Sequence, residues 1–577
     1  MHNKVNSLKS HTYNMLYQLN LPQQEELNRP IPYLRVKTLK LWLLSVPKSK
    51  PLKASSSFIQ QLDTINTSRY PVYERILLMD TLRPTARQLI VGLKKITKTA
   101  SLPLPTEARQ AYRLLQNLNA VMATGYKLIF NDLREVTKRK EHDELEMRGA
   151  IYLAMQYMSR QLVEAYLVYA QPPKTIWQEL HHLYQFAYQS GITDLAVDDP
   201  YPDFSLPTQY TIDLAYKRIL LLALAEPYHM VQGEADDIYY LLSAWTNACR
   251  IINEPSETPD SNYIVDMDSD SPPYFYNPDY SEKRNHSQVL DISEVIKRLD
   301  IHLERLIRHS LHVIDHNDAQ TLIERHQRDM LLRLSEAWNG NLVRQSERKT
   351  CNEEIKIASG LNASHFYISS GKTFTPETDE FNLQNDVINP TLTATAFQTA
   401  KEKDHDQPND DFAVLPWWQS NTSESGRALS CMTNCEKAHV KVGDLISYQV
   451  PVENTVHWSV GVIRWLKTIP GDKLEIGMMS LASSAVPVAV KALNGPGFGT
   501  DYFRALLIPK QISFLQTRSI LVPSYIYDVH SELAVNMKNK LFYIRLSTLQ
   551  RATNEFNQFT FEVLQHKPLA PNQFFNA

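Results

Sequence analysis

The sequence is poor in cysteine and glycine. Four cysteines among 577 residues are too few for a disulfide scaffold and fit a reducing compartment; they are Cys249, Cys351, Cys431 and Cys435. The 16 glycines favour helix over a chain made entirely of β-structure. The first ten residues, MHNKVNSLKS, lack the apolar stretch of a secretory signal.

Charge imbalance and long apolar runs are also missing. Sixty basic and 63 acidic residues leave a formal charge of -3, which argues against a general nucleic-acid coat protein. The longest apolar run, Ile219 to Ala225, is far shorter than the ~20 residues that span a bilayer. Hydrophobic residues make up 43%, as in ordinary globular proteins. We therefore expect a soluble, cytoplasmic protein of roughly three or four domains.

The first part of the chain, residues 1–253, has the periodicity of helices. Between Asp143 and Ala170, apolar residues recur at steps of three and four, which predicts one apolar stripe along a helix: Ile151, Met155, Met158, Leu162, Tyr166 and Tyr169. Similar stripes occur at 107–136, 175–190, 210–226 and 236–252. We interpret all of them as core-facing surfaces.

Composition changes at residues 254–286, where prolines alternate with Asp and Ser. This pattern predicts an exposed acidic loop, because it offers little apolar surface to bury. A helical pair is expected over 287–340, with one helix from about Ser287 and a second from about Asp315 to Trp338, ended by Asn339-Gly340.

After Gly340 the period switches to that of strands. Glu354–Ala358 alternates, and His365–Ile368 has strand-like composition, whereas residues 370–412 are polar and are interpreted as a disordered insertion. Strand patterns return at 413–418, 427–431, 444–450, 457–466, 474–481, 486–491, 502–508, 519–527, 541–546 and 559–564. The predicted fold is multidomain α + β: an all-α front, an antiparallel β-barrel at 341–492 and a β-rich extension at 493–577. The extension completes the barrel, forms a second one, or caps the helical half.

Two short motifs lie at the front of the predicted barrel. Arg344 and Arg348 form an R-x-x-x-R in the linker before its first strand, and Asn421, Ser423 and Gly426 form an N-x-S-x-x-G. Together they resemble the signature of the PilZ domain, a small β-barrel receptor for cyclic di-GMP. The resemblance continues in order through Val442-Gly443-Asp444, Gly461–Trp465 and Ile476–Met479, and covers about 342–369 and 413–492.

The specificity of the motifs differs. R-x-x-x-R also occurs at Arg83/Arg87 and Arg109/Arg113, where a solvated helix face is the expected explanation, whereas N-x-S-x-x-G occurs once. Asn421 follows Arg348 by 73 residues, more than PilZ domains usually have. Without the 43-residue insertion, 30 remain, enough for one strand and its return.

The resemblance implies that the motif residues bind cyclic di-GMP, a dianion with two guanines. Arginine can donate paired hydrogen bonds to phosphate or stack on a purine, and each charged hydrogen bond contributes roughly 1.5–3 kcal/mol. Asn421 can accept from guanine, Ser423 can donate its hydroxyl, and Gly426 would allow a positive φ and close backbone approach. Arg427 could contact a phosphate or pair with a surface carboxylate.

Other signals are weak. The Asp266-x-Asp268-x-Asp270 run lacks the glycine of a calcium loop, and Cys431, Cys435 and His439 lack a fourth metal ligand. We find no nucleophile–base set and expect no enzyme, no metal and no cofactor.

The resemblance implies a bacterial cyclic-di-GMP receptor that signals to a protein partner of the helical region, in control of motility, pili, attachment or biofilm. The alternatives are a nucleotide-independent helical scaffold with a structural barrel and, disfavoured by charge, a barrel that binds RNA or single-stranded DNA.

Overall fold

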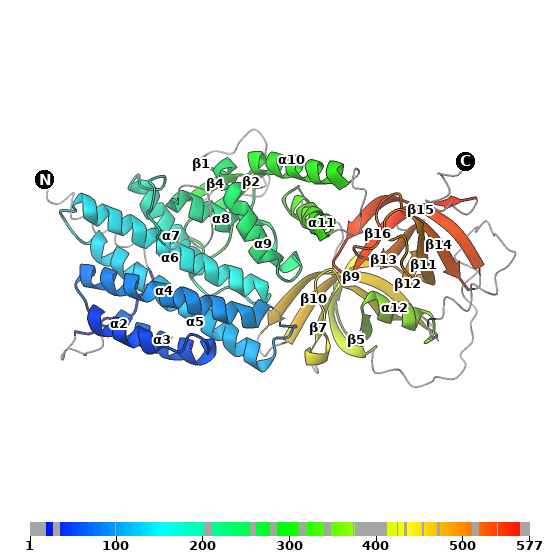
Figure 1. The fold of residues 1–577 in the computed structure, drawn as a ribbon, viewed down its shortest axis with the longest axis horizontal. Helices are drawn as coiled ribbons and strands as arrows, with labels where there is room; N and C mark the ends of the chain where they lie inside the picture. Colours follow the sequence, from blue (N-terminus) through cyan, green and yellow to red (C-terminus); the bar gives the residue numbers. More distant parts are fainter. Residues whose placement is uncertain are drawn as a thin grey trace. The chain divides into compact units, whose positions relative to one another are not determined.

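The fold comes from a computed structural model, and the chain divides into two compact units. The structure describes residues 19–26, 35–98, 100–200, 210–253, 261–276, 286–310, 319–339, 348–372, 374, 412–423, 425–431, 435–452, 455–469, 473–509, 518–538 and 540–565. One unit contains residues 1–300 and 334–341, and the other contains 301–333 and 342–577. Figure 1 shows helices in the first and strands in most of the second.

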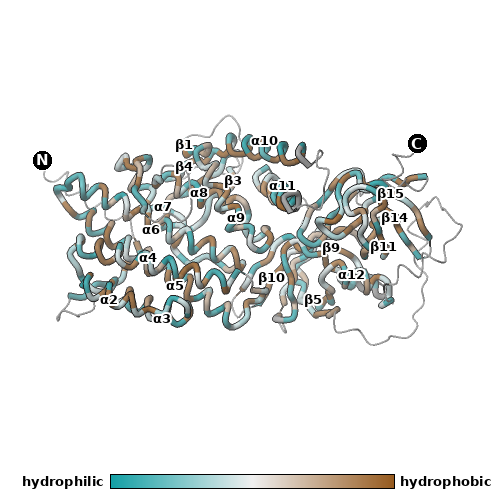
Figure 2. Tube along the Cα trace, viewed as in Figure 1, coloured by the Kyte–Doolittle hydropathy of each residue, from teal (hydrophilic) through white to brown (hydrophobic). Residues whose placement is uncertain are grey.

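The first unit is a stack of helices. They are α2 (Val36–Ser45), α3 (Pro51–Thr67), α4 (Val72–Lys98), α5 (Thr106–Arg134), α6 (Glu141–Leu167), α7 (Ile176–Gln189), α8 (Ile212–Leu224) and α9 (Glu234–Leu241). Hydrophobic and hydrophilic residues alternate along these helices in Figure 2, as expected for amphipathic helices. Helix α6 packs against α5, α7, α8 and α9. Its burial therefore extends beyond the expected stripe to Tyr152, Tyr157, Val163 and Glu164.

A small sheet occupies the region that we expected to be a loop followed by a helix. It consists of β1 (Arg250–Ile252), β2 (Asn262–Asp266), β3 (Tyr274–Phe275) and β4 (Ser287–Asp291), in the order β1-β4-β2-β3. All five residues of β2 are buried. The loop interpretation is wrong for the strands β2 and β3, because a segment too short to show a period pairs with β4 and is buried. Residues 267–271 between them are turns and bends, and 254–260 and 277–285 lie outside the described residues. The helix expected from Ser287 begins instead at α10 (Ser293–Ser310).

The second unit contains two closed barrels. The first has the strand order β10-β7-β6-β5-β8-β9. Its strands are β5 (Lys349–Ser359), β6 (Val414–Thr422), β7 (Gly426–Cys431), β8 (Leu445–Val452), β9 (Thr455–Ile469) and β10 (Lys473–Ala482). His365–Ile368, expected as a strand, belongs to helix α12 (Leu361–Ile368). Of the expected insertion, residues 373 and 375–411 lie outside the described residues.

The β-rich extension forms the second barrel, one of the three expected alternatives. Its order is β11-β12-β13-β16-β15-β14, with β11 (Val486–Asn494), β12 (Phe503–Ile508), β13 (Ser519–Pro523), β14 (Glu532–Met537), β15 (Lys540–Ala552) and β16 (Phe556–Leu564). Strand β11 pairs with β12 and β14, so the first barrel ends at Ala482 and not at the expected residue 492.

The two barrels share an apolar cluster. It combines side chains of the first barrel, including Leu445 and Val462, with side chains of the second, including Leu506 and Phe556. Helix α11 (Ala319–Asn339) contacts the second barrel through Arg325 and Arg328, whose guanidinium groups lie 3.6 and 3.2 Å from the Asp528 carboxylate. No helix of the described residues is both long and apolar enough to span a membrane.

Candidate functional site

The N-x-S-x-x-G motif is the turn of the β6–β7 hairpin. Thr422 and Arg427 form the last strand pair before the turn. The Ser423 N–H donates to the Gly426 carbonyl at 2.8 Å, and the Gly426 N–H donates to the Ser423 hydroxyl oxygen at 3.1 Å. The Ser423 hydroxyl in turn donates to the Gly426 carbonyl at 3.2 Å. The serine therefore holds the shape of its own turn, a role that the short side chain of serine suits.

Gly426 is required by its surroundings and not by its backbone angles. A Cβ at this position would lie 2.6 Å from the Met478 carbonyl oxygen of β10, so β7 and β10 approach each other closely here. Its φ is not among the positive values found in the chain. The expected close approach to a ligand stays a prediction, and the expected positive φ is wrong.

Strand pairing brings the two motifs together. Lys349 is paired with Thr422, and Thr350 with Asn421, in the antiparallel β5–β6 ladder. Arg348 immediately precedes Lys349 and is exposed, so it lies at the end of the barrel that carries the Ser423–Gly426 turn. The 73-residue separation is thus closed by one strand and its return, as the corrected spacing predicted. Arg344 lies outside the described residues.

Irregular pairing surrounds Asn421. Register shifts occur between Gln419 and Asn421 in the β6–β7 ladder and between Thr350 and Glu353 in the β5–β6 ladder. Such bulges redirect side chains and are common beside binding sites. The Asn421 side chain is half-buried, and no ion pair of the described residues involves Arg348. An amide and a guanidinium group are therefore both carried by residues at this edge of the barrel.

Arg427 is directed elsewhere. Its Nη1 donates to Gln419 Oε1 at 2.7 Å, and its Cζ lies 5.2 Å from the centre of the Tyr448 ring. Gln419 also donates from Nε2 to Cys351 Sγ at 3.0 Å. No surface carboxylate is among these contacts, and the expected phosphate contact of Arg427 stays a prediction. Sequence reasoning missed Gln419 and Tyr448. The available signal was the strand period, which places the polar Gln419 on the same face as Trp417, and both side chains are buried.

The remaining elements of the resemblance stabilise the barrel. Gly443 has a φ of 91°, and its N–H donates to the Ile463 carbonyl at 2.8 Å. A Cβ at Gly477 would lie 1.9 Å from Nε1 of Trp465, so the indole ring packs directly on this glycine. These residues join β8, β9 and β10 and support the site from a distance.

The other two R-x-x-x-R pairs lie in helices. Arg83 is buried in α4 and lies 2.6 Å from the Asp199 carboxylate, so its expected position on a solvated face is wrong. Arg109 donates to the Leu104 carbonyl at 3.0 Å, and Arg113 is exposed on α5. Within the described parts of the chain, no group of three or more His, Cys, Asp and Glu side chains is placed to hold a metal.

Three family models match successive parts of the chain. Residues 37–256 match the family model "Cyclic-di-GMP receptor FimW, N-terminal domain", residues 262–407 and 377–487 match its "middle PilZ domain", and residues 488–564 match the "FimW C-terminal beta-barrel domain". The Cyclic-di-GMP receptor FimW of Pseudomonas aeruginosa is 24% identical over 565 residues, which cover 91% of this chain and 90% of the relative. No solved structure matches. The first barrel is therefore a PilZ domain, and matches to the three FimW domain models follow one another along most of the chain.

Proposed function

We propose that this protein is a receptor for cyclic di-GMP that acts through protein partners and not by catalysis. The observation that carries the proposal is the β5–β6 register, which sets Arg348 beside the Ser423–Gly426 turn. The family models and the related protein, both named as cyclic-di-GMP receptors, support the choice of ligand.

Each proposed contact follows from the chemistry of the side chain. Arg344 and Arg348 bind the phosphates or stack on a guanine, since a guanidinium group offers both a planar face and paired donors. The Asn421 carbonyl oxygen accepts from guanine N–H groups. Ser423 and Gly426 shape the turn and present its backbone. Arg427 stabilises the barrel edge through Gln419 and Tyr448, so we assign it an indirect role.

The proposed output is an ordering of the linker between α11 and β5. Arg344 and Arg348 lie in this linker, and closure over the ligand would limit its conformations. A ligand produces this change only to the extent that it binds the closed arrangement more tightly. The ordered linker would change the surface that is offered to a protein partner of the helical region. Through this partner, the receptor would control motility, pili, attachment or biofilm. Small-angle scattering of ligand-saturated protein should differ from that of free protein; identical profiles would contradict the ordering.

Calorimetric titration of cyclic di-GMP into the full chain tests the receptor. Micromolar or tighter binding is expected for the wild type and loss of binding for Arg344→Ala/Arg348→Ala. The matched control is Arg305→Ala/Arg308→Ala, which removes two exposed arginines of α10 and should bind normally. No heat with folded wild-type protein would refute the proposal and favour the scaffold.

A further inference from the structure

Helix α2 exposes apolar side chains to an unusual degree. Leu44 is 82% exposed and Leu41 63%, the two highest values among the large apolar side chains of the described residues. Leu39 and Leu43, on the opposite side of the same helix, are buried, and α2 packs against α4. The helix thus has one leucine face toward the core and a second toward solvent.

The exposed leucines are accompanied by positive charge alone. Between Arg35 and Leu62 the sequence has no Asp or Glu. Six exposed cations lie in or beside α2, in the turn that follows it and in the first turn of α3: Arg35, Lys37, Lys40, Lys48, Lys50 and Lys53. Among the described residues, no ion pair joins any of the six to a carboxylate. This stretch of the chain therefore has a net positive charge.

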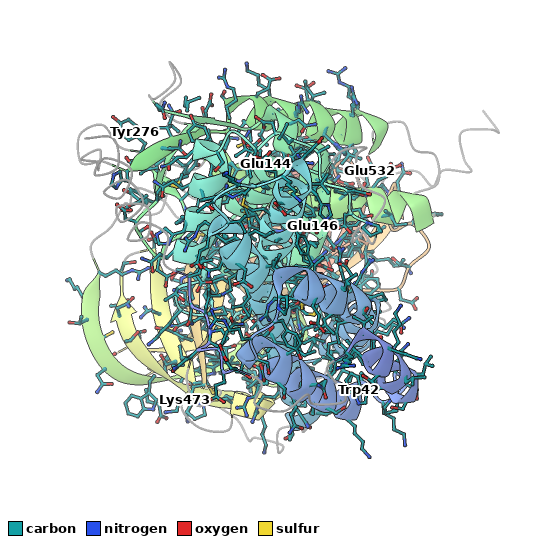
Figure 3. The ribbon with its side chains drawn as sticks, turned by 90° about the vertical axis from the view of Figure 1, so that its left-hand side faces the viewer. Trp42, Glu144, Glu146, Tyr276, Lys473 and Glu532 are labelled. Atoms are coloured by element: carbon teal, nitrogen blue, oxygen red, sulfur yellow. The ribbon has the colours of Figure 1, made fainter. Side chains whose placement is uncertain are left out.

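Helical spacing places both kinds of side chain on one face. Lys37, Lys40, Leu41 and Leu44 stand at i, i+3, i+4 and i+7, which is one side of an α-helix. Trp42, labelled on α2 in Figure 3, is half-buried, and its ring stacks on Phe58 of α3 with centroids 6.0 Å apart. This contact fixes the helix so that the Lys37–Leu44 face points outward.

We propose that α2 and the turn into α3 dock this unit on the surface of an anionic lipid bilayer. Leu41 and Leu44 insert at the boundary between headgroups and acyl chains, and the six cations bind lipid phosphates. Charge complementarity selects this partner: basic residues around apolar side chains are the pattern of a helix that lies in the membrane interface. Leu41 and Leu44 project from an exposed helix face, which suits a fluid surface better than a folded protein partner.

Vesicle co-sedimentation of the full chain tests the docking. Phosphatidylcholine vesicles containing about a third of phosphatidylglycerol should bind the wild type, and pure phosphatidylcholine should not, since each cation near an anionic surface strengthens binding roughly fivefold. Lys37→Gln/Lys40→Gln should therefore weaken binding roughly 25-fold. Leu41→Ser/Leu44→Ser should weaken it by about tenfold or more.

Leu145→Ser is the matched control, because Leu145 is 50% exposed on α6, outside the proposed surface. It should bind as the wild type does. Absence of wild-type binding, or equal binding by Leu41→Ser/Leu44→Ser, would overturn the proposal. So would a dimer, measured by light scattering without lipid, that dissociates in the leucine variant, because the face would then contact a second copy.

Discussion

Glu555 offers the sharpest test of how the two barrels are joined. It lies between β15 and β16 of the second barrel, and its carboxylate accepts backbone N–H bonds from Leu361, at the start of α12, and from Leu445, at the start of β8, the latter at 2.7 Å. One side chain of the second barrel therefore binds two elements of the first. Asp444 is adjacent to Leu445 and interacts electrostatically with the Glu555 carboxylate.

Burial raises the pKa of Glu555 from 4.5 to about 7, against the opposing effect of the two N–H donors. Burial and the Glu555 charge also raise the pKa of Asp444. Between about pH 4.5 and 7, the folded state thus holds a proton on Glu555 that the unfolded chain has lost. This contribution to stability is present below the unfolded value of 4.5 and is lost as pH rises through about 7. For one such group, the loss between about pH 5.5 and 8 is about 2 kcal/mol.

The assay compares the free energy of unfolding of the wild type and Glu555→Gln at both pH values. Gln does not titrate, and it also removes the charge that helps to raise the pKa of Asp444. The advantage of the wild type over the variant should therefore shrink by about 2 kcal/mol or more as pH rises. His365, whose pKa burial lowers to about 4, contributes with the opposite sign but equally in both proteins, so it cancels. Glu562→Gln, at an exposed position of β16, is the control. A difference that stays constant with pH would refute this account of Glu555.

Three further substitutions test the packing and one ion pair. Gly426→Ala would place a Cβ 2.6 Å from the Met478 carbonyl oxygen, so we expect the free energy of unfolding in urea to fall by about 1–3 kcal/mol. In Gly149→Ala of α6 the new Cβ meets nothing within 4 Å, so the free energy of unfolding should rise by about 0.5–1 kcal/mol. Equal stability of the two variants would contradict this reasoning. Asp528→Asn removes the carboxylate that Arg328 contacts at 3.2 Å and should cost up to about 3 kcal/mol in the same assay; an unchanged midpoint would show that the pair is dispensable.

Strands in which polar and apolar residues alternate were predictable from the sequence. Fully buried strands, and elements that depend on contacts with distant parts of the chain, were not. Strand β14 was missed because most of its residues are buried, which removes the alternation of a half-exposed strand. Helix α12 was mistaken for a strand because its first N–H is accepted by Glu555, 194 residues away, and no local pattern contains that partner. Strand β2 was missed because proline- and aspartate-rich neighbours hide a five-residue buried segment.

Local patterns were sufficient for the change from helix to strand after Gly340, for most barrel strands and for the Asn421–Gly426 turn, because each depends on residues close in sequence. Tertiary structure alone decided that Arg348 lies beside that turn and that Arg427 contacts Gln419 and Tyr448. Both depend on strand register, which pairs residues far apart in the chain. A shift of one residue would reverse the direction of each side chain, and only packing of the whole barrel selects the register that is observed.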